Sequence, residues 1–146
     1  MGSTRFSGPV YGAKQTLFSI GASTLSSGAG NGVANAIFAG TVVPLGEDWY
    51  VTEFQAFRGS TGSSAVGFSV LDDSTVLSSI TFTSTTANAN TINILTPDGG
   101  EKEGVRVLSG STVHFAYTNS SAQGGLSNVN VSIFGFRRFV NSSRSE

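Results

Sequence analysis

The sequence predicts an all-β protein, an antiparallel β-sandwich of the jelly-roll-like type with about eight strands and an extended N-terminal arm. Short segments rich in Val, Ile, Phe and Thr alternate between apolar and polar residues, as half-buried strands do. Clusters of Gly, Asn, Asp and Ser separate these segments at the close intervals typical of sandwiches. In contrast, the apolar spacing of an amphipathic helix is not sustained in any window of a dozen residues.

Eight or nine strands are predicted, because nine segments carry the strand pattern. A jelly roll has eight strands, which agrees with this count. The order in which the strands pair does not follow from the pattern. The predicted strands are residues 15–20, 35–43, 49–57, 65–71, 75–82, 91–96, 104–108, 112–118 and 128–140.

The clearest alternation lies in residues 65–71, where Val66, Phe68 and Val70 share one face. Asp72 and Asp73 follow directly, and strand-like residues resume at once. Aspartates favour tight turns, so these two strands are predicted to form a hairpin.

The last predicted strand changes character along its length. Val129, Val131 and Ile133 would face the core, while the opposite face begins with polar residues and continues with Phe134 and Phe136. Either a bulge turns the strand over, or the aromatic face is an interface. On the second interpretation Phe134, Phe136 and the nearby Arg138 are candidate self-association residues.

The composition limits the function classes. The chain has 146 residues, a net charge of −1, 12% charged residues and no cysteine, so it fits one domain without disulfides or Cys-ligated metals. Lys and Arg are few and scattered, so no nucleic-acid partner is expected. No apolar run is long enough for a membrane helix, so no membrane partner is expected. The N-terminus has no signal-peptide pattern, so synthesis in a cytoplasm is expected.

Catalytic groups are sparse. His114 is the single histidine, and no G-x-S-x-G elbow accompanies it. Most carboxylates fall in predicted turns; Glu53 lies within a strand, with Arg58 or Arg106 as a candidate partner. We therefore expect no enzyme, no catalytic residues, no cofactor and no metal.

Trp49 and Tyr50 are adjacent in a predicted strand. Because neighbouring residues point to opposite faces, only one of the two is expected in the core. The other is a candidate platform for a sugar ring, with a buried Trp49 counting against that use.

The N-terminal segment differs from an ordinary polar tail. The stretch "RFSGPVYG" lacks clean alternation yet holds large apolar groups beside Pro and Gly. The domain plan is an arm at residues 1–14, a sandwich at 15–140 and a polar tail at 141–146. The candidate anchoring residues of the arm are Arg5, Phe6, Pro9, Val10 and Tyr11.

The stretches "VVPLGEDWYVTEFQAFRGSTGSSAVGFSVLDDSTVLSSITF" and "GVRVLSGSTVHFAYTNSSAQGGLSNVNVSIFGF" follow a recognisable rhythm. In rhythm and composition the chain resembles small β-sandwich virion proteins of tailed bacteriophages, and "RFSGPVYG" resembles the leading arm of phage structural proteins. The resemblance implies a capsid decoration, or cement, protein. It also implies a homo-oligomer, a trimer in many such proteins, that binds the major capsid protein on the outer surface of the virion.

Three other functions compete with decoration. A tail or fibre component would also be a virion protein. A carbohydrate-binding β-sandwich module would expose Trp or Tyr, and a hydrolase on a jelly roll would need paired acids or a histidine-based triad.

Overall fold

The computed structural model describes residues 13–25, 36–58, 66–82, 89–96, 104–119 and 126–139. The predicted arm residues Arg5, Phe6, Pro9, Val10 and Tyr11 lie outside the described residues, as does the predicted tail at 141–146.

All nine predicted strand segments are strands, so the all-β prediction is confirmed. Most bounds differ from the prediction by one or two residues, as in the third strand, which begins at Glu47 rather than Trp49. The largest difference is in the first strand, which extends to Leu25. The strands are β1 (Gln15–Leu25), β2 (Ala36–Val42), β3 (Glu47–Arg58), β4 (Val66–Asp72), β5 (Thr75–Phe82), β6 (Ala89–Ile94), β7 (Val105–Val107), β8 (Thr112–Asn119) and β9 (Leu126–Phe139).

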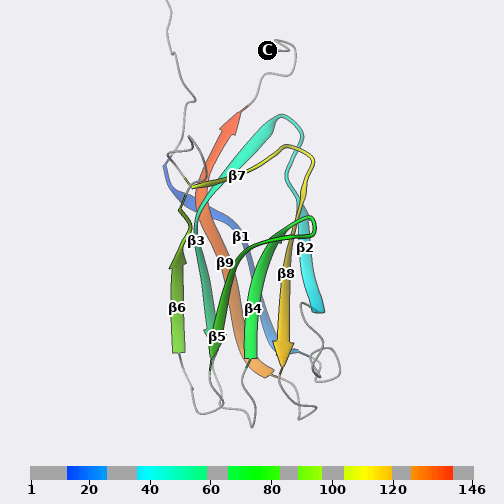
Figure 1. The fold of residues 1–146 in the computed structure, drawn as a ribbon, viewed down its shortest axis with the longest axis vertical. Helices are drawn as coiled ribbons and strands as arrows, with labels where there is room; N and C mark the ends of the chain where they lie inside the picture. The colour runs from blue at the N-terminus through cyan, green and yellow to red at the C-terminus, as the bar shows by residue number, and fades with distance from the viewer. Residues whose placement is uncertain are drawn as a thin grey trace, which may run out of the picture.

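The strands form two antiparallel sheets that face each other, so the predicted β-sandwich is confirmed (Figure 1). Sheet I has the order β1-β9-β3-β6, with the short β7 pairing with β3 beside β6. Sheet II has the order β2-β8-β4-β5. In sheet I the last strand lies between the first and the third, so segments distant in the sequence are hydrogen-bonded neighbours.

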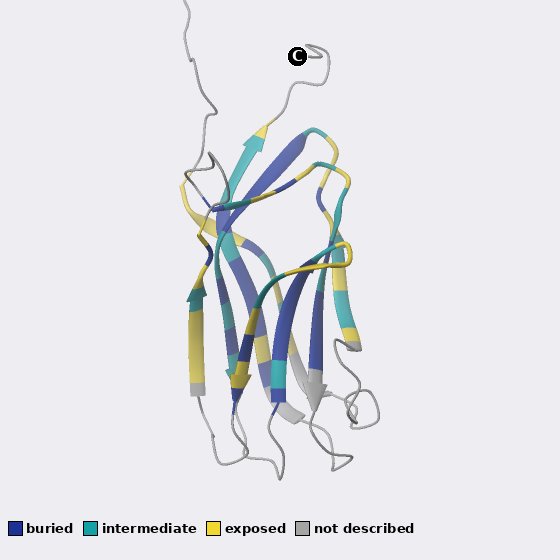
Figure 2. Cartoon of the chain, viewed as in Figure 1, coloured by how far each residue is buried: buried dark blue, intermediate teal, exposed yellow. Residues whose placement is uncertain are grey.

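The core lies between the sheets and is built from the alternate residues that the sequence assigned to it (Figure 2). Phe115 of β8 is its centre: its ring stacks on Phe18 with the ring centroids 4.7 Å apart, and it lies 6.1 Å from the ring of Phe54. The predicted inward faces are confirmed, because their residues are all buried: Val66, Phe68, Val70, Val113, Phe115, Tyr117, Val129, Val131 and Ile133.

The predicted hairpin between β4 and β5 is present. Asp73 occupies the left-handed region with φ 53°, which short polar side chains tolerate better than other non-glycine residues. The turn is tied to β8, because Asp73 N–H donates to Thr112 O and Asp73 Oδ1 accepts from Thr112 N–H.

Two β-bulges in sheet I lie at the same level. The register shifts in β1 between Thr16 and Phe18, and in β3 between Val51 and Glu53, and both shifts are opposite Phe134 of β9. The extra residues are in the flanking strands, while β9 keeps its alternation. A bulge within β9 is therefore not the reason why Phe134 and Phe136 lie on its outer face.

Candidate functional site

The outer face of sheet I carries three aromatic residues close together. Phe134 and Phe136 of β9 lie on the face opposite the buried Ile133, and both are partly buried. Tyr50 of β3 is the cross-strand neighbour of Phe136. We call Tyr50, Phe134 and Phe136 the outer aromatic surface.

Gly135 lets β3 and β9 approach closely within this surface. A Cβ built on Gly135 would lie 1.9 Å from the carbonyl oxygen of Tyr50, much closer than any real carbon–oxygen contact. The close approach lies beside the β3 bulge. A glycine flanked by two phenylalanines in a strand was the sequence signal for it, because such glycines often mark a close backbone approach.

Of Trp49 and Tyr50, only Trp49 belongs to the core between the sheets, as the alternation predicts, yet Tyr50 on the other face is also buried, and each is only 3% exposed. Trp49 lies in the core, and its Nε1–H donates to Glu47 Oε1 at 2.8 Å. Tyr50 lies on the opposite face, where its hydroxyl oxygen accepts from Arg138 Nη1 at 3.3 Å. Arg138, a predicted self-association residue, is thus held next to the outer aromatic surface.

An ion pair borders this surface at the β7 side. Asp48 is buried and accepts from Arg106 Nη2 at 2.8 Å, from Arg106 Nε at 3.1 Å and from Ser109 N–H at 2.9 Å. Arg106 is the cross-strand partner of Tyr50, so its guanidinium spans from one edge of the surface to Asp48. Charge-assisted bonds of this kind hold a side chain in one geometry.

A second ion pair joins Lys14 to Glu53 across the surface. The suggested partners of Glu53 were therefore wrong: Arg106 binds Asp48, and Arg58 lies on the inner side of β3, fully buried. Burial lowers the pKa of the Arg58 guanidinium. Lys14 directly precedes β1, and Thr16 of β1 pairs with Phe134. The start of β1 therefore lies beside the outer aromatic surface.

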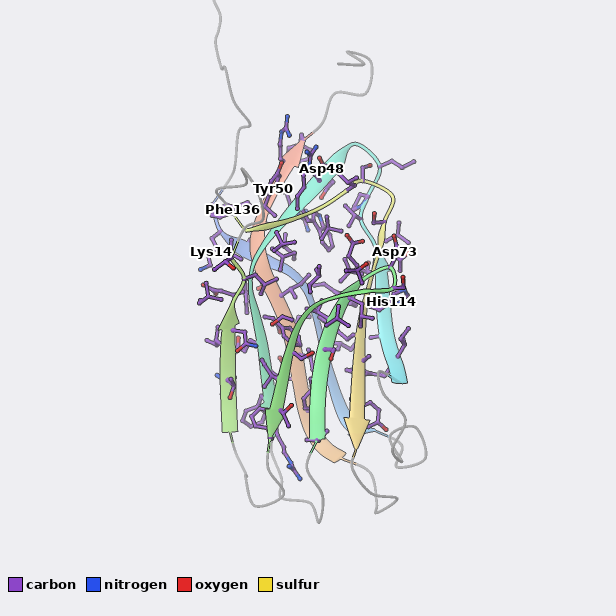
Figure 3. All side chains as sticks on the ribbon, in the orientation of Figure 1. Lys14, Asp48, Tyr50, Asp73, His114 and Phe136 are labelled. Atoms are coloured by element: carbon purple, nitrogen blue, oxygen red, sulfur yellow. The ribbon has the colours of Figure 1, made fainter. Side chains whose placement is uncertain are left out.

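Figure 3 shows the arrangement: Lys14, Phe136, Tyr50 and Asp48 lie in one region of the molecule, and His114 and Asp73 lie on the other side. His114 is half-buried on the outer face of sheet II, between Gly40 and Leu71 on the neighbouring strands. Its Nδ1 atom is buried without a hydrogen-bond partner. Within the described ranges, no three His, Asp or Glu side chains lie close enough to hold a metal ion.

The comparisons with known proteins do not assign this chain to a family. No protein-family model matches it. No curated protein is significantly similar to it in sequence.

In the part of the chain that the structure describes, no helix is long and apolar enough to cross a membrane.

Sequence reasoning found Phe134, Phe136 and Arg138, and the structure places all three at one site. It considered Tyr50 only as a platform for a sugar ring, and it missed the roles of Asp48 and the Lys14–Glu53 pair. The charged residues gave no usable signal, since Asp48 lies in a turn-like stretch and its partner Arg106 is 58 residues away in the chain.

Proposed function

We propose that this chain is a non-enzymatic structural protein of a tailed-phage virion, a capsid decoration protein that binds the major capsid protein on the outer shell. The carrying observation is the outer aromatic surface, which lies on the solvent side of sheet I, beside the start of β1, where the predicted arm joins the sandwich. An arm anchored there could dock on the shell while the sandwich stays folded.

Aromatic rings that are exposed to solvent are unfavourable, and a partner that covers them gains binding free energy. Phe134 and Phe136 lie outside the core between the sheets and remain partly exposed. Covering a large aromatic side chain contributes roughly 1.5–3 kcal/mol, so a partner that covers two of them gains appreciable affinity. Many copies around a shell would multiply weak contacts of this kind.

The same surface supports self-association into a homo-oligomer, with a trimer as the proposed state. The Asp48–Arg106 pair holds polar groups at its border, and the Lys14–Glu53 pair places charges beside Phe134. An apolar centre with a polar rim is the usual organisation of a protein interface.

The strand order supports assigning the sandwich to the jelly-roll type. Consecutive strands β1 to β5 alternate between the sheets until the β4–β5 hairpin, and the first and last strands are neighbours in sheet I. The jelly roll is common in viral capsid proteins, and this is an analogy of fold only.

A carbohydrate-binding module is less well supported. Trp49 is in the core with its indole N–H bonded to Glu47, and Tyr50 is almost fully covered, so neither presents an open ring to a sugar. A tail or fibre location remains the alternative within the virion, and the experiment below separates it from decoration.

The test uses intact phage particles and the isolated shell. Antibody against the chain should label the capsid surface in electron micrographs; labelling of the tail alone, or no labelling, contradicts decoration. Deleting residues 1–12, which leaves Lys14 and β1 in place, should change the Tm little and abolish co-sedimentation with shells of the major capsid protein. A large loss of stability would show that these residues belong to the folded core.

A further inference from the structure

The edge strands of the two sheets are protected unequally. Edge strands present unpaired backbone groups, and proteins usually protect them with bulges, charges or proline. Next to edge strands β1, β2 and β5 the pairing contains a register shift, whereas β6 pairs with β3 over six consecutive positions without one. The short β7 also pairs without a shift, but over only three positions. Among the described strands, β6 is therefore the longest regular edge.

The composition of β6 does not protect it either. Its sequence, ANTINI, contains no charged residue and no proline. Its outer side chains include Ile92, which is 50% exposed, and Ile94, which is 68% exposed. Figure 2 shows the strand as exposed along most of its length at one side of the molecule.

The backbone of β6 directs two hydrogen-bonding positions outward. Leu95 N–H donates to Thr52 O of β3 at 2.9 Å. Because alternate residues of an antiparallel strand point their N–H and C=O to the same side, Asn93 and Thr91 also face β3. The N–H and C=O groups of Ile92 and Ile94 therefore face the side of β6 on which no described strand lies, which we call the free edge.

The strand is held in place from the inner side. The side chain of Asn93 donates to Ser78 Oγ at 3.1 Å and to Ser79 O at 2.8 Å, which links β6 to β5 of the other sheet. The free edge is thus preformed, and a strand that adds to it incurs little ordering cost on this side.

We infer that β6 pairs antiparallel with β6 of a second copy of this chain. With Asn93 opposite Asn93 of the partner's copy on the two-fold axis, Ile92 lies opposite Ile94 in both halves. Those are the positions whose backbone groups face outward, so each pair exchanges both hydrogen bonds. The isoleucines form two apolar cross-strand pairs, and no like charges oppose each other.

A second copy fits this edge because β6 is complementary to itself. In the antiparallel register above, the outward N–H and C=O groups and the isoleucines of one copy lie opposite the same groups of the other. The contact is isologous, so it closes as a pair and joins two copies of sheet I into one continuous sheet. The inference goes beyond the proposed function, since it requires neither a shell nor the arm, and the contact is separate from the outer aromatic surface.

Sedimentation velocity on the purified full chain, over a range of concentrations, tests the pairing. Ile94→Lys places a charge in the contact and should halve the mass of the assembly. Ile92→Pro should also halve the mass, because proline lacks the outward N–H with which Ile92 would bond to the second copy. The pairing of β6 with β3 does not use this N–H, so it should be kept. The matched control is Val42→Lys, a residue that is 56% exposed on the bulged edge strand β2, and it should leave the mass unchanged.

Emission from Trp49 and the Tm should show that both variants remain folded. The inference is overturned if the parent chain is monomeric at every concentration, or if Ile94→Lys and Ile92→Pro sediment like the parent. It is also overturned if deletion of residues 1–12 reduces the mass in the same way, because the arm of a neighbouring copy would then be what occupies the edge.

Discussion

The Cα of Gly135 lies against the carbonyl oxygen of Tyr50, so closely that a methyl group there would come within 1.9 Å of that oxygen. The obstacle is backbone, which cannot move aside as the end of a flexible side chain does. The contact brings β9 and β3 together in the middle of the outer aromatic surface, between Phe134 and Phe136.

Gly135→Ala should therefore destabilise the fold by about 1–3 kcal/mol, the usual cost of forcing an added group into a packed site. Urea unfolding followed by Trp49 emission measures it. Gly67→Ala is the matched control in β4, because the nearest atom to its added Cβ is Thr81 Oγ1 at 3.5 Å, an ordinary contact. Its effect should stay within about 0.5 kcal/mol. Equal effects from the two substitutions would contradict the assigned contact.

Asp48→Ala should cost about 2–3 kcal/mol of unfolding free energy. The change removes the acceptor for Arg106 and for the Ser109 N–H at a buried position, and hydrogen bonds to charged groups are stronger than neutral ones. Glu53→Ala removes the more exposed pair with Lys14 and should cost less than about 1 kcal/mol. Chemical denaturation of both variants gives the comparison, and a larger loss for Glu53→Ala would reverse the order of importance.

Phe136→Asp should dissociate the proposed oligomer. The substitution puts a charge at the centre of the outer aromatic surface, where a partner would have to desolvate it. Sedimentation velocity measures the mass, with Leu45→Asp as control, since Leu45 is exposed in the turn before β3. An unchanged mass for Phe136→Asp, in a chain that remains folded by its Tm, would show that this surface is not the self-association site.

Asp72→Asn should raise the Tm at pH 7. Burial, followed by repulsion from Asp73, raises the pKa of the Asp72 carboxyl in the folded protein. A raised folded pKa means that the native state holds the proton more tightly than the unfolded chain. The carboxyl thus lowers stability as the pH rises from the unfolded pKa to the folded one, and the loss persists above it.

The asparagine lacks this ionisation, so its advantage should disappear near about pH 3, where an aspartate of ordinary pKa is mostly protonated. Calorimetric melts at the two pH values are sufficient. The same Tm difference at both would mean that ionisation of Asp72 is not its cause.

The strands could be predicted because each one carries its own alternation. Val113, Phe115 and Tyr117 identify the inner face of β8 without knowledge of its neighbours, and all three are buried. The end of β1 was missed because the stretch after Ile20 is small and polar, and it is a strand through its pairing with β9. That pairing is tertiary, so local sequence does not contain it.

The candidate site was predicted only where it lies on one strand. Alternation from Ile133 places Phe134 and Phe136 on the outer face of β9. The same rule assigned one of Trp49 and Tyr50 to solvent, because it could not include a cross-strand neighbour such as Phe136 or the donor Arg138. The partner of Glu53 was missed for the same reason, since Lys14 reaches it only when β1, β9 and β3 are assembled.

The place of β9 in sheet I has a consequence for how the chain acquires its fold. β1 and β3 are not neighbours, and β9 joins them. Sheet I therefore cannot close until residues 126–139 have been synthesised, and its pairing bridges nearly the whole length of the described chain. Such distant contacts slow folding, because closing a long loop costs chain entropy before the contacts can compensate for it. A truncated product that lacks β9 would leave β1 without its partner and β3 paired only on its β6 and β7 side. It would also have neither Phe134 nor Phe136 with which to enter an assembly.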